Sequence, residues 1–207
     1  MSKRGNVFLA IGLLLLVAAL FLTVFNFHAS NKAGAASKEV MDALHEELPA
    51  ELHRESVRYI YESKPKEDAP IPEMAVVEEN GYNYIGILEI PALELSLPVM
   101  AEWDYDRLKI SPCVYTGSYY TDDLVICAHN YMSHFGRLSQ LKLGEEIYLT
   151  TVDGYVYSYT VDNIETVQPT EIELMTEATD WDLTVFTCYP SGATRCTVRC
   201  VLVSDDD

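Results

Sequence analysis

Positive charge is scarce in this sequence of 207 residues. From residue 74 to the end it has six Lys and Arg residues against 22 Asp and Glu, and the formal net charge of the whole chain is −18. A protein that binds nucleic acid through its phosphates needs a cationic surface. The composition therefore argues against nucleic acid as a partner, whereas 49% hydrophobic residues are typical of a folded protein.

The sequence also lacks a Cys-x-x-Cys pair, an internal repeat and a paired-histidine zinc motif. Its five cysteines are an odd number, which does not suit a closed disulfide framework. We interpret four of them as small buried hydrophobic residues, namely Cys113, Cys127, Cys196 and Cys200. A redox or resolving role is an alternative for Cys127 alone, which lies two residues before a histidine.

An uncharged apolar run of 19 residues, Val7–Phe25, stands near the N-terminus. As a helix it would be about 28 Å long, close to the ~30 Å hydrocarbon thickness of a bilayer. Lys3 and Arg4 precede the run and the next basic residue is Lys32, so the positive-inside rule places the N-terminus in the cytoplasm and the rest outside the cell. A cleaved signal peptide is the alternative, with small residues at 33–37 as its cleavage site, but its apolar core would be unusually long.

Two further segments separate this predicted anchor from the rest of the chain. Within residues 36–62, apolar residues recur at nearly helical spacing and Pro49 interrupts them, which predicts two short amphipathic helices. Residues 64–72 contain three prolines and alternating charges, as in an extended tether. We therefore expect a cytoplasmic stub and membrane anchor at 1–30, a helical stalk with a proline-rich linker at 31–73, and an extracellular domain at 74–207.

After residue 74 the sequence consists of short apolar or alternating runs, which predict a mainly β domain. The expected strands are 84–90, 95–100, 124–128, 146–151, 155–164, 183–188 and 194–203. Asp153-Gly154 between two of them predicts a hairpin with a type I′ turn, in which both residues have positive φ. Many short strands suggest a closed barrel or a sandwich, and closure removes exposed strand edges.

Cys188 differs from the other cysteines because it ends a predicted strand, and the Tyr-Pro-x-Gly sequence that follows should expose its thiol at the rim. The next strand begins near Arg195, and an antiparallel return places this residue across from Cys188, with their Cα atoms about 5 Å apart. In the same register Arg199 faces Thr184. Both lie on the same face as Cys188 and Arg195, but four residues further from the end of the strands. His129 also ends a strand. A cysteine nucleophile, a histidine acid/base and an arginine stabiliser form a complete set for acyl transfer.

Two segments resemble signature motifs of the sortases, which are Gram-positive cysteine transpeptidases. The segment 125–131, with His129 between an alanine and an asparagine, is similar to their Ala-Gly-His-Asn segment. The segment 184–188, Thr-Val-Phe-Thr-Cys, is followed by Arg195 and resembles their Thr-Leu-x-Thr-Cys motif with its downstream arginine. Alanine before His129 and valine in the second motif are small departures that we expect to be tolerated. With upstream segments included, the resemblance covers about residues 83–203.

The resemblance implies an eight-stranded β-barrel in which Cys188 is the nucleophile, His129 the acid/base and Arg195 the third active-site residue. Thr187 would help to shape the peptide groove, although an ordinary strand role is the simpler interpretation. The enzyme would cleave the C-terminal sorting signal of secreted proteins through a thioester. It would then transfer them to an amine of a peptidoglycan precursor or to a pilin lysine, at the outer face of the cell membrane. No cofactor or metal is implied.

Alternatives to this interpretation concern both class and function. The sequence has no Asp-Pro-aromatic lid, which argues against a pilus-building enzyme, and the segment 165–182 is short for the helical insertion of class B. A papain-like cell-wall cysteine hydrolase would place its cysteine before its histidine, the reverse of the order here. A non-catalytic adhesion module would require both motifs to be coincidental.

Acidic residues are concentrated in two expected loops. Glu102, Asp104 and Asp106 belong to one, and Glu171 and Glu173 to the other. Calcium could bridge such groups, but no ligand loop of fixed spacing is present, so a solvated acidic surface is the favoured interpretation.

Overall fold

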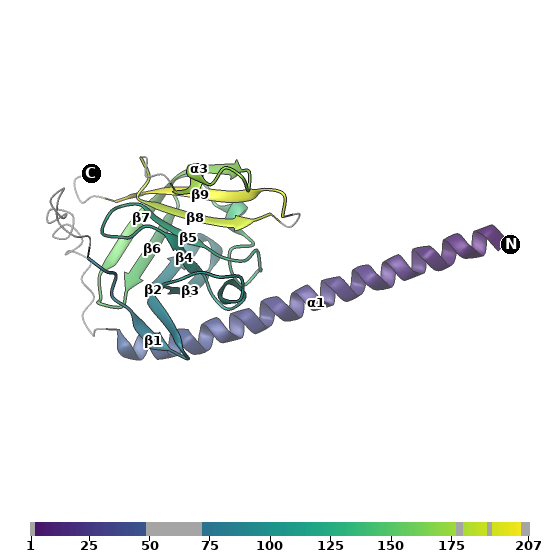
Figure 1. The fold of residues 1–207 in the computed structure, drawn as a ribbon, viewed down its shortest axis with the longest axis horizontal. Helices are drawn as coiled ribbons and strands as arrows, with labels where there is room; N and C mark the ends of the chain where they lie inside the picture. Colours follow the sequence, from purple (N-terminus) through teal and green to yellow (C-terminus); the bar gives the residue numbers. More distant parts are fainter. Residues whose placement is uncertain (1–2, 49–71, 177–179, 190–191, 204–207) are drawn as a thin grey trace.

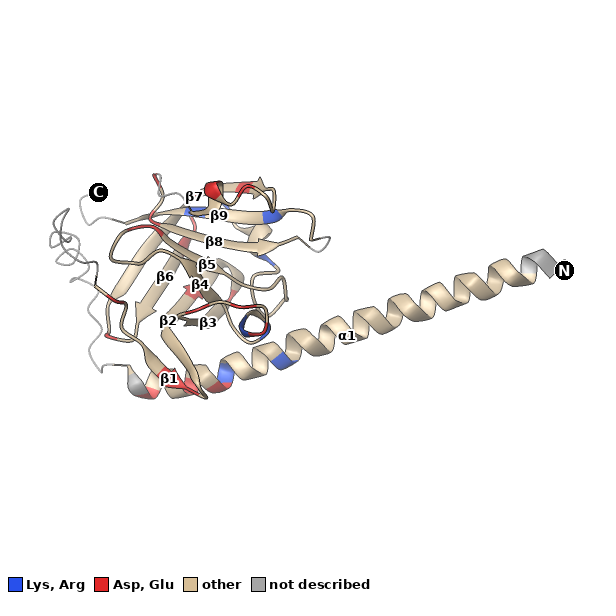
Figure 2. Ribbon diagram, in the orientation of Figure 1, with Lys and Arg blue, Asp and Glu red and all other residues tan. Residues whose placement is uncertain are grey.

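The computed structural model describes residues 3–48, 72–176, 180–189 and 192–203. It consists of one long helix, α1 (Lys3–Glu47), and a β-barrel that packs against the C-terminal part of that helix (Figure 1). Red segments outnumber blue ones on the barrel, as the composition requires (Figure 2). The mainly β fold with an N-terminal apolar helix is therefore confirmed.

Nine strands and four short helices are formed by the described residues. The strands are β1 (Val77–Glu79), β2 (Tyr82–Ile90), β3 (Leu95–Met100), β4 (Cys113–Thr116), β5 (Leu124–Cys127), β6 (Glu146–Thr151), β7 (Val156–Val167), β8 (Leu183–Cys188) and β9 (Arg195–Leu202). The short helices are η1 (Pro91–Leu93), η2 (Arg107–Lys109), η3 (Leu138–Gln140) and α3 (Glu173–Thr176).

Pairing of β2 with β6 closes the sheet into a barrel. The strand order is β1-β2-β3-β4-β5-β8-β9-β7-β6, so β2 to β9 form the eight-stranded ring and β1 extends it as a hairpin with β2. Two pairs are parallel, β3 with β4 and β5 with β8, and the others are antiparallel. The parallel β5–β8 pair brings the ends of these two strands to the same side of the barrel, although Cys127 and Leu183 are 56 positions apart in the sequence.

Alternation along the strands produces two apolar layers. The barrel interior is filled by residues such as Ile126, Val185 and Val198, all fully buried. On the outer face, Phe186 and Cys127 belong to a second cluster that includes Val40, Met41 and Leu44 of α1. Because an exposed sheet face of this kind would be costly in water, the helix serves as its cover.

Helix α1 is continuous from the predicted membrane span into the stalk. By length and composition it is apolar enough to cross a membrane, and the apolar window is wholly exposed in the protein. Burial begins at Ser30 and recurs with helical periodicity along one face, at Ala33, Ser37, Val40, Met41 and Leu44. The first of the two expected amphipathic helices is thus the end of α1 rather than a separate element. The second, after Pro49, lies outside the described residues, as does most of the proline-rich linker.

The predicted strands are confirmed with small shifts at their ends. Strands β1 and β4, of three and four residues, carry too short a pattern to be recognised in the sequence. The hairpin between β6 and β7 is also confirmed, but its predicted turn type is wrong. Only Gly154 has positive φ, at +91°, and its N–H bonds the carbonyl of Thr151 at 2.9 Å. Asp153 instead accepts a hydrogen bond from the Thr151 hydroxyl, which holds it in a turn of another type.

Candidate active site

Strands β8 and β9 place Cys188 and Arg195 opposite each other. Their antiparallel register pairs Cys188 with Arg195 and Thr184 with Arg199, as predicted from the sequence. The intervening loop is tightened by a hydrogen bond of 2.9 Å from the N–H of Tyr189 to the carbonyl of Thr194. Cross-strand neighbours of this kind lie on one face of the sheet, so the thiol and the guanidinium share the outer face of the barrel.

His129 reaches the same end of the barrel through the parallel pair β5 and β8. Cys127 pairs with Phe186, and the N–H of Ala128 donates to the Phe186 carbonyl at 3.2 Å. Two residues beyond this pair, His129 follows the end of β5 and Cys188 is the last residue of β8, so both stand where the two strands end. Three neighbouring strands, β5, β8 and β9, therefore bring the three predicted residues to a single rim.

Thr187 fixes this arrangement from the interior side. Its side chain is buried, with 4% of its surface exposed, and its hydroxyl donates to the carbonyl of Ala128 at 2.8 Å. The bond joins the residue before Cys188 to the residue before His129. The Thr187 hydroxyl is thus engaged inside the protein, where it links the two chain segments that lead to Cys188 and His129.

The loop after His129 is wound tightly by its own hydrogen bonds. The N–H of Phe135 donates to the carbonyl of His129 at 3.2 Å, and the N–H groups of His134 and Gly136 both donate to the carbonyl of Tyr131. A side chain at Gly136 would approach that carbonyl to 2.7 Å, so the close turn requires glycine. The rings of His129 and Tyr131 stack with centroids 4.8 Å apart, which restrains the imidazole.

Burial lowers the pKa of His129 below its ordinary value, and the nearby ammonium of Lys109 lowers it further. At neutral pH the imidazole is therefore mainly uncharged and can accept a proton. His134 is fully buried, and burial, assisted by His129, lowers its pKa to about 4. Its two ring nitrogens make no hydrogen bond of normal geometry with the described residues, so His134 is a neutral core residue.

An aromatic row supports Arg195 from the side. The guanidinium carbon of Arg195 lies 5.9 Å from the centroid of the Phe186 ring, at the outer limit of a cation–π contact. Phe186 in turn meets Tyr115 edge-to-face at 5.3 Å, and Tyr115 contacts Trp103 at 5.0 Å. Trp103 is 39% exposed, so the row extends from the candidate site to the surface.

Arg199 is committed to structural contacts. It is 4% exposed, and its guanidinium donates to the Glu165 carboxylate at 2.8 Å, to the Thr184 hydroxyl at 3.0 Å and to the carbonyl of Leu174. These bonds tie the segment between β7 and β8 to the two strands of the site. Arg195, by contrast, is partly exposed and makes no ion pair within the described part of the chain.

The other four cysteines are buried and reduced, as predicted, whereas Cys188 is partly exposed. Cys113 and Cys127 face each other across β4 and β5. Burial raises the pKa of the Cys113 thiol to about 12 and also raises that of Cys127. A thiol in this state is a poor nucleophile, which favours a packing role for Cys127 over a redox role.

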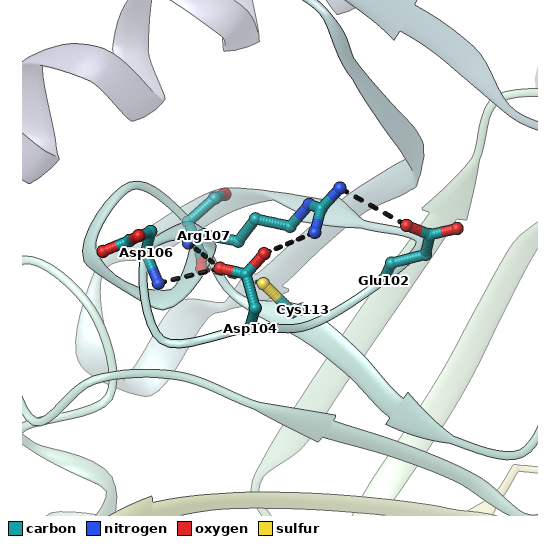
Figure 3. A network of polar contacts seen from close by, with 6 residues as sticks. Glu102, Asp104, Asp106, Arg107 and Cys113 are labelled. Atoms are coloured by element: carbon teal, nitrogen blue, oxygen red, sulfur yellow. Dashed lines mark hydrogen bonds and ion pairs between the residues drawn. The ribbon is translucent and has the colours of Figure 1, made fainter.

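The acidic loop before β4 is partly neutralised from within (Figure 3). Arg107 bridges Asp104 and, at 3.4 Å, Glu102, and Lys109 pairs with Asp106 at 2.7 Å. Asp104 also accepts the N–H groups of Asp106 and Arg107, and these bonds lower the pKa of its carboxyl group. No group of three metal ligands is found among the described residues.

Comparison with known proteins agrees with this arrangement. The family model of the sortase domain matches residues 88–205, more than half of the chain. This chain belongs to the sortase family. Sortases are cysteine transpeptidases. The match covers β3 to β9, and so includes all three residues at the rim.

Individual sortases show the extent of the similarity. The chain is 26% identical to Sortase A of Listeria monocytogenes over 154 residues, which are 67% of this chain and 66% of the relative, just under two thirds of its length. Sortase C1 of Streptococcus suis is 28% identical, with a TM-score of 0.50, 58% of this chain covered and 73% of that one. Sortase C of Clostridium perfringens, solved with the C-terminal cell wall sorting motif, is 25% identical, with a TM-score of 0.52 and coverages of 80% and 90%.

Some features of this sortase site lie beyond what the sequence indicated. Tyr131 and Phe186 lie within the two segments that resemble the motifs, and Ser133 follows the first of them. Their residue types alone did not indicate that they contact the site or its loop. The proline after Tyr189, which belongs to the predicted strand-ending sequence, lies outside the described residues.

Proposed function

We propose that this chain is a membrane-anchored transpeptidase that uses Cys188 as nucleophile, His129 as acid/base and Arg195 as stabiliser. The observation that supports this most directly is the convergence of the three residues at the ends of β5, β8 and β9. The other four cysteines are buried, and Arg199, the other arginine of β9, already donates hydrogen bonds to Glu165 and Thr184. The rim is thus the place where a thiol, an imidazole and a guanidinium are accessible together.

The geometry supports a two-step acyl transfer. Neutral His129 accepts the proton of the Cys188 thiol as sulfur attacks a backbone carbonyl of the donor peptide. Arg195 stabilises the oxyanion of the tetrahedral intermediate with its planar donors. When the peptide bond breaks, the imidazolium returns its proton to the leaving amine and a thioester remains on Cys188. A second amine then attacks the thioester, the new amide forms, and the thiol is restored.

The donor in this proposal is the sorting-signal peptide of a secreted protein. The related Clostridium perfringens structure with a cell wall sorting motif supports that class of substrate. The acceptor is an amine of a peptidoglycan precursor or a pilin lysine. The helix α1 would anchor the enzyme in the cell membrane, with its N-terminus in the cytoplasm and the barrel outside.

The test is incubation of the full-length protein in detergent with a panel of sorting-type peptides and a small amine, followed by mass analysis. We expect one peptide class to yield both a Cys188 thioester and an amide product. Cys188→Ala should abolish turnover without loss of fold.

Cys127→Ala is the matched control, because it removes a thiol from the neighbouring strand but leaves the rim intact. It should retain activity. Turnover by the Cys188→Ala protein, or a thioester mapped to another cysteine, would contradict the proposal.

A further inference from the structure

The barrel and the membrane helix are joined rigidly, because α1 runs without a break from the apolar segment into the barrel contacts. No linker intervenes between Phe25, the last residue of the apolar run, and Ser30, the first buried residue of α1. The two are five residues apart, which corresponds to about 7 Å along a helix. The barrel therefore has a fixed height above the bilayer if α1 spans it.

The first part of the barrel that α1 meets is the loop that begins with His129. The hydroxyl of Ser133 donates to the carbonyl of Ser30 at 2.8 Å, and the two hydroxyls lie 3.1 Å apart. One turn further along, a side chain at Gly34 would come within 3.2 Å of the Ser133 Cβ atom, so the absence of a side chain permits this close contact. Later contacts follow in order, with Ser37 donating to the carbonyl of Ile110 and Leu44 packing near the β1–β2 hairpin.

This order of contacts orients the candidate site. Ser133 lies at the height of Ser30, and His129 is only four residues away, which limits their separation to about 14 Å. Cys188 and Arg195 occupy the same rim as His129. Figure 1 agrees, since the arrowhead of β8 points to the side on which the N-terminal half of α1 extends beyond the barrel.

We propose that α1 holds the rim of Cys188, His129 and Arg195 close to the outer surface of the bilayer, facing it, so that the enzyme acts on peptide bonds within about 20 Å of the membrane. The height of the rim above the bilayer would thereby decide which peptide bonds the enzyme reaches. The part of this inference that concerns the substrate rests on the proposed function, whereas the part that concerns the position of the rim does not. The position and the substrate selection can therefore be tested separately.

The geometry is tested by labelling Cys188 with a maleimide dye, since the other cysteines are buried. The full-length protein is reconstituted in phosphatidylcholine–phosphatidylglycerol vesicles that contain an acceptor dye on the lipid headgroups. We expect strong energy transfer from Cys188. A dye at Glu46→Cys in a Cys188→Ala background is the reference, because Glu46 lies 16 residues beyond Ser30 on α1, about 24 Å further out.

A helical insertion provides the sharper comparison. Seven residues inserted between Phe25 and Ser30 add about two turns, which raise the barrel by about 10 Å while nearly preserving the direction it faces. Energy transfer from Cys188 should fall, whereas the same insertion after Ser2 should leave it unchanged. Equal transfer from Cys188 and Glu46→Cys, or no response to the insertion before Ser30, would overturn the proposed orientation.

Substrate selection is tested with the peptide that the panel identifies, linked at its C-terminus to a palmitoyl chain through spacers of graded length. The wild-type protein should cleave the short-spacer reporter at least ten times faster than the variant raised by seven residues, and the variant should prefer a spacer about 10 Å longer. Both should cleave the unanchored peptide equally, which separates a failure of the chemistry from a failure of the geometry. The same spacer preference in both proteins would refute selection by height.

Discussion

Each of the three residues at the rim has a counterpart of the same type that is buried in the neighbouring structure. The pairs are Cys188 and Cys127, Arg195 and Arg199, and His129 and His134. The buried members lie within a few residues or one strand of the rim. Arg199 is held by hydrogen bonds, whereas burial keeps Cys127 and His134 uncharged. Residue type therefore does not distinguish the partly exposed member of each pair. Position near the end of a strand does, because fewer neighbouring side chains cover a residue there.

The arginine pair gives the largest predicted effect on stability. Arg199→Met removes three hydrogen-bonded contacts and leaves Glu165 without its cation, so we expect the free energy of unfolding to fall by about 3 kcal/mol. Urea unfolding of the full-length protein in detergent, followed by circular dichroism, measures this. Adding Glu165→Gln should recover part of the loss. A change below about 1 kcal/mol would show that Arg199 is not the structural member of the pair.

The histidine pair predicts a difference in how stability depends on pH. His134 has a pKa of about 4 in the folded protein and an ordinary value of 6.5 when unfolded, so the unfolded chain binds more protons between these values. Its contribution to stability is complete above about pH 6.5 and is lost as the pH falls toward 4, by on the order of 3 kcal/mol.

His134→Phe should keep the ring packing and lose this dependence, so the difference in stability between variant and wild type should be constant at neutral pH and grow in favour of the variant as the pH falls toward 4. The difference between the two proteins is the quantity to measure, since carboxyl groups titrate in both. Parallel curves would mean that His134 finds a partner when it is protonated.

Arg195→Lys should lower kcat/KM by about 100-fold, equivalent to about 2.7 kcal/mol, although the charge is preserved. The ammonium cannot present two donors in one plane to the oxyanion. Stability should change little, because Arg195 is partly exposed. Kinetics with the cleaved peptide and urea unfolding of the same preparation separate the two effects. Wild-type rates in this variant would remove Arg195 from the reaction.

The local patterns of the sequence predicted a mainly β domain and the pairing of Cys188 with Arg195, whereas the eight-stranded barrel was implied by the family resemblance. Short apolar or alternating runs marked seven of the nine described strands, and the turn after Cys188 set the register that pairs it with Arg195. His129 could be placed at a strand end, but its position beside Cys188 required the parallel β5–β8 pair, which no local pattern encodes. The motif resemblance supplied that step.

Long-range contacts account for what the sequence did not predict. The continuity of α1 was missed because a change from apolar to polar composition resembles a boundary, although the helix continues through it. The bonds between Ser30 and Ser133 join residues 103 positions apart, and neither serine carries a signal of its own. Contacts of this kind form only in the folded protein, where Gly34 on α1 permits the close approach of the loop that contains Ser133.

The smallest predicted effect concerns the electrostatic setting of His129. Lys109 lowers the pKa of this imidazole, so Lys109→Met should raise it and shift the acidic limb of the kcat/KM profile to higher pH, provided that neutral His129 is the form that reacts. Burial is the larger cause and persists in the variant, so the shift should be small. Lys142→Met is the matched control and should not shift the limb, since Lys142 is not among the groups that act on His129.

Raising the salt concentration should reduce the difference between Lys109→Met and wild type, because the Lys109 side chain is exposed. If the imidazolium rather than the neutral ring began the reaction, the variant would instead shift the basic limb to higher pH and leave the acidic limb unchanged.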